Sequence, residues 1–131
     1  MIALDTNVLA RYLLNDSPAQ ARRAEQLLSG PQTCTAPLTV LLELVWVLES
    51  CDCAREDIVQ AVSQLCGLEH FAPPQPEALL GALQWYAAGF DFADALHLAQ
   101  SADASTFQTF DSAFAKAAAK ADTQPAVALL C

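Results

Sequence analysis

The chain contains 131 residues and carries a formal net charge of −9, from 15 acidic and 6 basic side chains. Hydrophobic residues make up 54% of the sequence and charged residues 16%, which excludes the polar, highly charged composition of a disordered protein. The length predicts a single domain over residues 1–131, and the negative charge excludes a broad basic surface for polyanions or anionic membranes.

In chain order, the first half of the sequence alternates short apolar runs with stretches of helical periodicity. Apolar runs at 2–4, 33–36 and 68–72 are expected to be strands. Between them we expect helices over 7–14, from Ser17-Pro18 to Gly30-Pro31, from Pro37 onwards and over 55–66. Ser-Pro is typical of a helix start and Gly-Pro of a helix end.

The second half of the sequence begins with a proline-rich turn at 73–76 and continues the alternation. Helical patterns cover about 77–88, 90–102 and 112–121, and the runs at 105–110 and 126–130 predict strands. Short strands alternating with helices predict an α/β fold, in which helices cover both faces of a mainly parallel sheet.

Cysteine usage and the N-terminus favour a reduced, cytoplasmic protein. The sequence contains five cysteines, at Cys34, Cys51, Cys53, Cys66 and Cys131. They form an odd set without C-x-x-C spacing, and no basic segment precedes an apolar stretch at the N-terminus. Neither His70 nor His97 lies at zinc-finger spacing from the cysteines. No apolar run reaches the roughly 18–20 residues that span a bilayer, so no membrane association is expected.

Two acidic residues directly follow predicted strands. Asp5 follows the run at 2–4, and Asp111 follows the run at 105–110. Ligands of parallel α/β sheets collect at the carboxyl ends of the strands, so the two carboxylates converge if their strands are neighbours. The alternative is that each aspartate only caps the next helix.

Glu43 lies in a segment, 38–48, that is apolar almost all round. Such a helix is expected to be buried on most faces, and its only polar stripe is Thr39 and Glu43. A buried carboxylate requires a cation or a hydrogen-bonding partner. The alternative is a salt bridge to an arginine such as Arg11, Arg22 or Arg23.

Asp91 and Asp94 are three residues apart, on one side of a predicted helix. Asp91 suits the helix N-cap or first turn, where the helix dipole favours a negative charge. Asp94 lies among apolar residues, so, like Glu43, it would require a cation or a hydrogen-bonding partner if it is buried. His97 is better interpreted as a histidine of the core, or one beside a site, than as a metal ligand.

Convergence of these acids would require a compensating cation, because like charges at short range repel strongly. A set of oxygen ligands without His or Cys favours Mg²⁺ or Mn²⁺ over Zn²⁺. Magnesium held by carboxylates keeps waters and bridges to phosphate, which suits activation of a water for phosphodiester cleavage. The acids therefore predict a metal-dependent phosphodiester hydrolase.

In their order along the chain, these acidic motifs resemble those of PIN-domain ribonucleases, and most closely the VapC-type toxins of bacterial toxin–antitoxin pairs. The matching segments are Leu4-Asp-Thr-Asn-Val-Leu9, Glu43 in its apolar helix, Asp91-Phe-Ala-Asp94-Ala-Leu-His-Leu-Ala99 and Thr109-Phe-Asp111. The resemblance covers essentially the whole chain. It implies a three-layer α/β/α sandwich with a mainly parallel central sheet of four to five strands.

The same resemblance implies an endoribonuclease that depends on Mg²⁺ or Mn²⁺ and cleaves cellular RNA such as tRNA or rRNA. It also implies a homodimer and a cognate antitoxin protein, whose C-terminal segment occupies the active-site groove. An inactive PIN-like module that binds protein is the alternative. An aspartyl-phosphate phosphatase is disfavoured, because its second aspartate would stand at the position of Asn7.

The resemblance also assigns residue roles. Its catalytic and metal-binding acids fall on Asp5, Glu43, Asp94 and Asp111. Of these, Asp5, Asp94 and Asp111 would hold metal, while Glu43 would contact it directly or through water and orient the attacking water. Asn7, Thr109 and Asp91 would support them. Candidate contacts to RNA phosphates are Arg11, Arg22, Arg23, Lys116 and Lys120.

Overall fold

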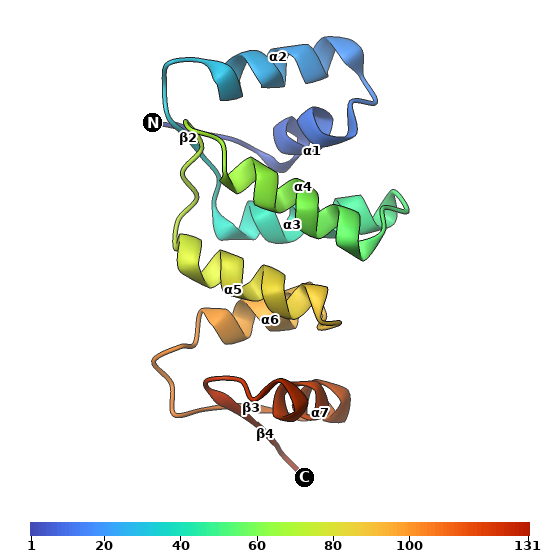
Figure 1. Ribbon diagram of the computed structural model, residues 1–131, viewed down its shortest axis with the longest axis vertical. Helices are drawn as coiled ribbons and strands as arrows, with labels where there is room; N and C mark the ends of the chain where they lie inside the picture. Colours follow the sequence, from blue (N-terminus) through green and yellow to red (C-terminus); the bar gives the residue numbers. More distant parts are fainter. The chain divides into compact units, whose positions relative to one another are not determined.

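The chain forms seven helices and four short strands over residues 1–131, all of which the computed structural model describes (Figure 1). Four of the helices, α3 to α6, follow one another without an intervening strand. The chain divides into two units, Met1–Pro76 and Glu77–Cys131, here called unit 1 and unit 2. No helix is long and apolar enough to cross a membrane.

Unit 1 contains one parallel pair of strands and four helices. In chain order these are β1 (Ile2–Ala3), α1 (Thr6–Leu14), α2 (Pro18–Ser29), β2 (Cys34–Thr35), α3 (Leu38–Ser50) and α4 (Arg55–Cys66). The pairing of β1 with β2 places Ile2 opposite Cys34. Helix α1 packs against α2 and α3, and α3 packs against α4. The side chains of Leu9, Leu41, Leu44 and Ile58 are almost completely buried among these helices.

Unit 2 contains the second parallel pair of strands and three helices. These are α5 (Pro76–Ala87), which starts at the last residue of unit 1, then α6 (Phe92–Ala99), β3 (Thr106–Thr109), α7 (Ser112–Ala121) and β4 (Ala126–Leu129). Strand β3 pairs with β4 from Thr106 opposite Ala126 to Thr109 opposite Leu129.

Aromatic contacts build much of the core of unit 2. Tyr86 meets Phe92 edge-on at a centroid distance of 5.5 Å, and Phe114 meets Phe90 at 6.3 Å and Phe107 at 5.7 Å. These distances lie in the range that aromatic pairs prefer. The core therefore anchors α5, α6, β3 and α7, the last three of which adjoin acidic residues of the sequence motifs.

Local sequence signals place most element boundaries correctly. The helices expected over 55–66 and 112–121 are α4 and α7. The strands are parallel as predicted, but they form two two-stranded sheets where one sheet of four to five strands was expected. The strand expected at 68–72 is wrong, because turns fold this segment, with Leu68 N–H bonded to Leu65 and Phe71 N–H to Leu68. Only an isolated bridge between Cys34 and Phe71 remains.

The helix expected over 90–102 is shorter in the structure. Asp91 caps its start, so α6 begins at Phe92. Past Ala99 the backbone tightens into turns, in which Ser101 N–H bonds to Leu98 and Ala104 N–H to Ser101. The apolar periodicity therefore extends beyond the helix at both ends.

Candidate active site

Asp5 follows strand β1 and forms the N-cap of α1. Its backbone is extended, with φ −84° and ψ 164°, and its Oδ1 accepts the Thr6 N–H at 2.8 Å. The side chain is exposed. One carboxylate oxygen therefore caps the helix, which is the capping role considered from the sequence. The second oxygen is left for another partner.

Glu43 is exposed on α3, and its predicted burial is wrong. The apolar side chains of this helix face other elements on one side only, and Glu43 lies on the uncovered side. Its Oε1 accepts a hydrogen bond from the Thr6 hydroxyl at 3.1 Å. The predicted alternative of a salt bridge to Arg11, Arg22 or Arg23 is also wrong, because the partner of Glu43 is Thr6, and Arg11 pairs with Asp16.

Thr6 connects the two acids of unit 1. It is 7% exposed, its N–H donates to Asp5, and its hydroxyl donates to Glu43. In the sequence, Thr6 stands out only as a member of the motif Leu4-Asp-Thr-Asn-Val-Leu9. The available signal was a hydroxyl residue between Asp5 and Asn7, in the first turn of the helix.

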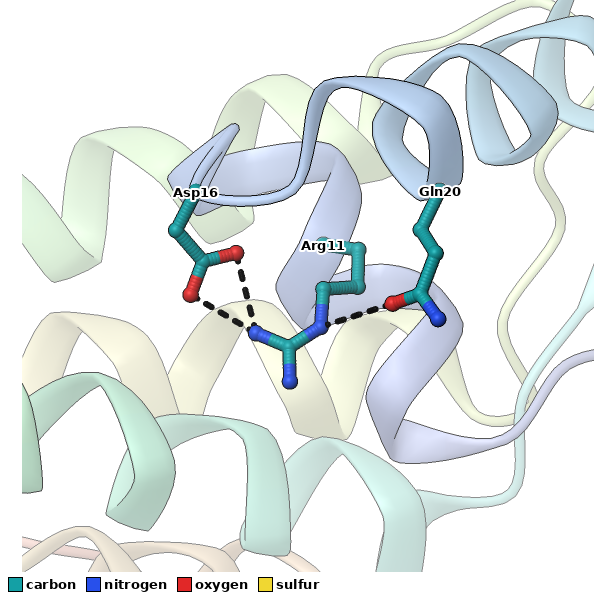
Figure 2. Close-up of polar contacts among 3 residues, drawn as sticks. All are labelled: Arg11, Asp16 and Gln20. Carbon is teal, nitrogen blue, oxygen red and sulfur yellow. Dashed lines mark hydrogen bonds and ion pairs between the residues drawn. The ribbon is translucent and has the colours of Figure 1, made fainter.

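Arg11 is engaged within unit 1 (Figure 2). Its Nη1 donates to both Asp16 oxygens, at 2.9 and 2.7 Å, and its Nε donates to Gln20 Oε1 at 3.1 Å. These contacts link the last turn of α1 to α2 and occupy two edges of the guanidinium group. They make Arg11 a poorer candidate for a phosphate contact than the exposed Arg22 and Arg23.

An open hollow of about 660 Å³ lies between α1 and α2. Its lining includes Asn7, Arg11, Gln20 and Arg23. Asn7 is exposed and belongs to the motif that contains Asp5, but neither Asp5 nor Glu43 lines the hollow.

In unit 2, Asp91 and Asp111 are also N-caps. Asp91 Oδ2 accepts the Asp94 N–H at 3.1 Å at the start of α6. Asp111 follows β3, and its Oδ1 accepts the Phe114 N–H at 3.1 Å at the start of α7. Thr109 Oγ1 accepts the Asp111 N–H at 3.0 Å, so Thr109 supports the backbone that presents Asp111.

Asp94 is the half-buried acid of unit 2. Burial raises the pKa of its carboxyl group, and the negative charges of Asp91 and Asp111 raise the pKa further, while His97 lowers it. The structure therefore brings Asp91, Asp94 and Asp111 within electrostatic reach of one another. His97 itself is exposed, so of its two predicted places the core is wrong, while its effect on the pKa of Asp94 agrees with the other, a histidine beside the site.

Lys116 and Lys120 are exposed one helical turn apart on α7, the helix that Asp111 caps. Their spacing gives α7 a small positive stripe.

The structure contains no group of three or more His, Cys, Asp or Glu side chains that could hold a metal ion.

A comparison with protein-family models matches residues 2–120 to the PIN domain. The chain belongs to the PIN-domain family. A comparison with curated proteins found no match. The family match includes elements of both units and all of the acids described above.

The PIN domain is a three-layer α/β/α fold, and the seven helices and parallel strands of this chain are compatible with it. PIN domains are generally nucleases, and the family generally depends on divalent metals such as Mg²⁺. The chemistry of the donors fits such an ion, because carboxylate and hydroxyl oxygens are hard ligands. A cation would also relieve the repulsion among Asp91, Asp94 and Asp111.

Proposed function

We propose that this PIN domain is an endoribonuclease that uses Mg²⁺ or Mn²⁺ to cleave cellular RNA of the tRNA or rRNA class. The supporting observation is the way its acids are presented. Asp5 and Asp111 are each the second residue past the end of a strand, β1 and β3 respectively, and each is fixed through one carboxylate oxygen by a backbone N–H. Acids held in this way have a second oxygen available for a metal without losing the helix cap.

The residues that would hold metal are Asp5, Asp94 and Asp111, with Glu43 in contact directly or through water. A bound divalent ion lowers the pKa of its water and stabilises the charge that develops on the phosphate. Glu43 is positioned by the Thr6 hydroxyl at one oxygen, so its other oxygen can orient the attacking water and accept its proton. Asn7, Thr109 and Asp91 support these acids.

We further propose that the protein is the toxin of a toxin–antitoxin pair and acts in the cytoplasm as a homodimer. The order and spacing of the acidic motifs, which resemble those of VapC-type toxins, support this role. A cognate antitoxin would inhibit the enzyme by occupying the active-site groove. In this proposal, basic side chains such as Arg22, Arg23 and Lys116 supply only local phosphate contacts, because the net charge of the chain is −9.

The test combines metal binding with RNA cleavage. We expect calorimetric titration to show Mn²⁺ binding to the wild-type protein, and total cellular RNA to be cleaved in the presence of that metal. Asp5→Asn and Asp94→Asn should lose both properties. Asp103→Asn is the matched control, because Asp103 is an exposed acid in the turn after α6 and outside the motifs.

Two results would contradict the proposal. Equal cleavage by the wild-type protein and Asp94→Asn would show that the activity belongs to a contaminant. Absence of both metal binding and cleavage in the wild-type protein would favour an inactive PIN-like module that binds protein.

A further inference from the structure

Two of the five cysteines, Cys51 and Cys53, lie in the turn that joins α3 to α4 (Figure 1). Both are free thiols; Cys51 is exposed and Cys53 is half-buried. Neither belongs to the candidate active site. An exposed thiol is open to oxidation, and a second thiol beside it decides what the oxidised product becomes.

The backbone of this turn is a Schellman motif, which ends many helices. Cys53 N–H donates to the Leu48 carbonyl at 3.1 Å, and Asp52 N–H donates to the Glu49 carbonyl at 3.0 Å. Asp52 adopts the left-handed conformation of the motif, with φ 63°. The motif explains the half-burial of Cys53, because the residue at its position commonly packs against the end of the helix. It gives no reason for a cysteine at the exposed C-cap, Cys51.

The turn gives the two cysteines a separation that suits a disulfide. In an extended chain, the Cα atoms of residues two apart lie about 7 Å from each other, and a turn shortens this distance. Disulfides join residues whose Cα atoms are about 4.4–6.8 Å apart. The left-handed conformation of Asp52 folds the backbone between Cys51 and Cys53, which brings the pair into that range.

Electrostatics gives the two thiols different roles. Burial raises the pKa of Cys53, and the negative charges of Cys51, Asp57 and Asp52 raise the pKa further. The two thiols therefore lie within electrostatic reach of each other, and a thiolate at Cys51 keeps the proton on Cys53. The exposed Cys51 is accordingly the thiol that reacts first with an oxidant in solution.

The other cysteines do not combine exposure with a neighbouring thiol. Cys34 is buried, and its Sγ donates to the Leu27 carbonyl at 3.5 Å. Burial raises the pKa of Cys66 to about 11, so this thiol stays protonated at neutral pH. Cys131 is exposed, but no other cysteine lies near it in the sequence. The turn after α3 is therefore the place where oxidation can end in a disulfide between neighbours.

We propose that Cys51 and Cys53 form a reversible disulfide when the protein meets a hydroperoxide. The Cys51 thiolate attacks the peroxide, which forms a sulfenic acid, breaks the O–O bond and releases water or an alcohol. The Cys53 thiol then attacks the Cys51 sulfur, which forms the S–S bond, breaks the S–O bond and releases water. The cysteine pair loses two electrons and two protons, and the peroxide gains them.

This disulfide should be easily reduced. It would close a ring over only three residues at an exposed site, and strained or exposed disulfides have more oxidising potentials than structural ones. Thiols such as glutathione should therefore return the pair to the free state. The inference does not depend on the proposed nuclease activity.

The test adds hydrogen peroxide to the reduced full chain and then cleaves the chain after its glutamates. Cleavage after Glu49 and Glu56 releases residues 50–56, in which Cys51 and Cys53 are the only cysteines. We expect this peptide to lose the mass of two hydrogen atoms and to resist alkylation, at peroxide levels that leave the other cysteines free. Glutathione should restore the original mass and both reactive thiols.

Three variants check the order of the steps. Cys53→Ser should stop at the sulfenic acid of Cys51, which dimedone labels, and the wild type should lose most of this labelling because Cys53 consumes the sulfenic acid. Cys51→Ser should form no disulfide in the peptide. Cys131→Ser is the matched control, because it removes another exposed cysteine, and it should form the same disulfide as the wild type.

Three results would overturn the proposal. The first is a peptide 50–56 that stays reduced in the wild type while peroxide oxidises another cysteine. The second is equal dimedone labelling of the wild type and Cys53→Ser, which would show that Cys53 does not react with the sulfenic acid. The third is a disulfide that links Cys51 to Cys131 or to a second copy of the chain. All three can be observed whether or not the protein cleaves RNA.

Discussion

At the scale of the residue, the Thr6 hydroxyl is the contact that most directly affects the proposed chemistry. It lies in a buried position and donates to a carboxylate that is otherwise exposed. Hydrogen bonds to charged groups are among the stronger ones in proteins, so this bond restricts the orientation of Glu43. We regard Thr6 as a positioning residue, because it acts through Glu43.

Thr6→Val should lower kcat for RNA cleavage about tenfold, less than the roughly 10²–10⁴-fold loss that follows removal of a general base. The thermal midpoint should change little, because valine fills the same buried space. Thr6→Ser restores the hydroxyl and should recover most of the rate. A variant series in which kcat follows thermal stability instead would indicate a purely structural role.

Asp94 should make the stability of the metal-free protein depend on pH. Since the folded state raises the pKa of this carboxyl above its ordinary value of 3.8, the folded state keeps the proton to higher pH than the unfolded chain does. Its contribution to stability is therefore greatest at low pH and is lost as the pH rises through the folded-state pKa.

We accordingly expect Asp94→Asn to raise the thermal midpoint near neutral pH when a chelator is present, because it removes the repulsion by Asp91 and Asp111. The difference from the wild type should shrink as the solution is acidified toward the ordinary aspartate pKa of about 4. Calorimetry over this pH range tests whether Asp94→Asn raises or lowers the thermal midpoint. Asp103→Asn is measured alongside as the control. A midpoint lowered by Asp94→Asn at neutral pH would contradict it.

At the scale of the element, three helices of this protein start at acids of the candidate site. Asp5, Asp91 and Asp111 cap α1, α6 and α7 by accepting backbone N–H groups. A capping role and a metal-binding role were competing interpretations of the sequence. The geometry makes them compatible, since a cap uses one carboxylate oxygen.

Asp111→Ser should separate the two roles. Serine is a good N-cap and has no carboxylate, so the free energy of unfolding should stay close to that of the wild type while Mn²⁺ binding and cleavage are lost. Asp111→Ala should lose the cap as well and destabilise the protein by about 1 kcal/mol. Urea unfolding measures the capping role, and Mn²⁺ titration of the same variants measures the metal-binding role. Retention of Mn²⁺ binding in Asp111→Ser would exclude Asp111 as a ligand.

At the scale of the whole molecule, the excess of negative charge and the proposed metal are connected. With 15 acidic residues against 6 basic ones, a divalent ion bound to the acids offsets part of the repulsion. A ligand that binds only the folded state also stabilises it, by about 2.7 kcal/mol at 100 times its Kd.

Excess Mn²⁺ should therefore raise the thermal midpoint of the wild-type protein, with a dependence on metal concentration. Asp5→Asn and Asp94→Asn should show a much smaller rise, and Asp103→Asn the full one. Scanning fluorimetry over a Mn²⁺ series measures this. An equal rise in all four proteins would indicate nonspecific binding of the ion to the acidic surface.

The sequence by itself determined the features that depend on near neighbours along the chain. Helix limits at α4 and α7, the helix start at Pro18, and aspartates at the starts of α1, α6 and α7 follow from local periodicity and capping preferences. The order of the acidic motifs was sufficient to indicate the PIN-domain family, which the family comparison confirms.

Only the tertiary structure decided which surfaces are covered. Helix α3 is apolar almost all round, yet Glu43 and Trp46 are exposed, because burial depends on where other elements pack and not on the helix's own composition. The bond from Thr6 to Glu43 spans 37 positions of the chain. The apolar run at 68–72 folds into turns that leave one bridge to Cys34. Contacts between residues distant in sequence decide these features, and local patterns do not encode them.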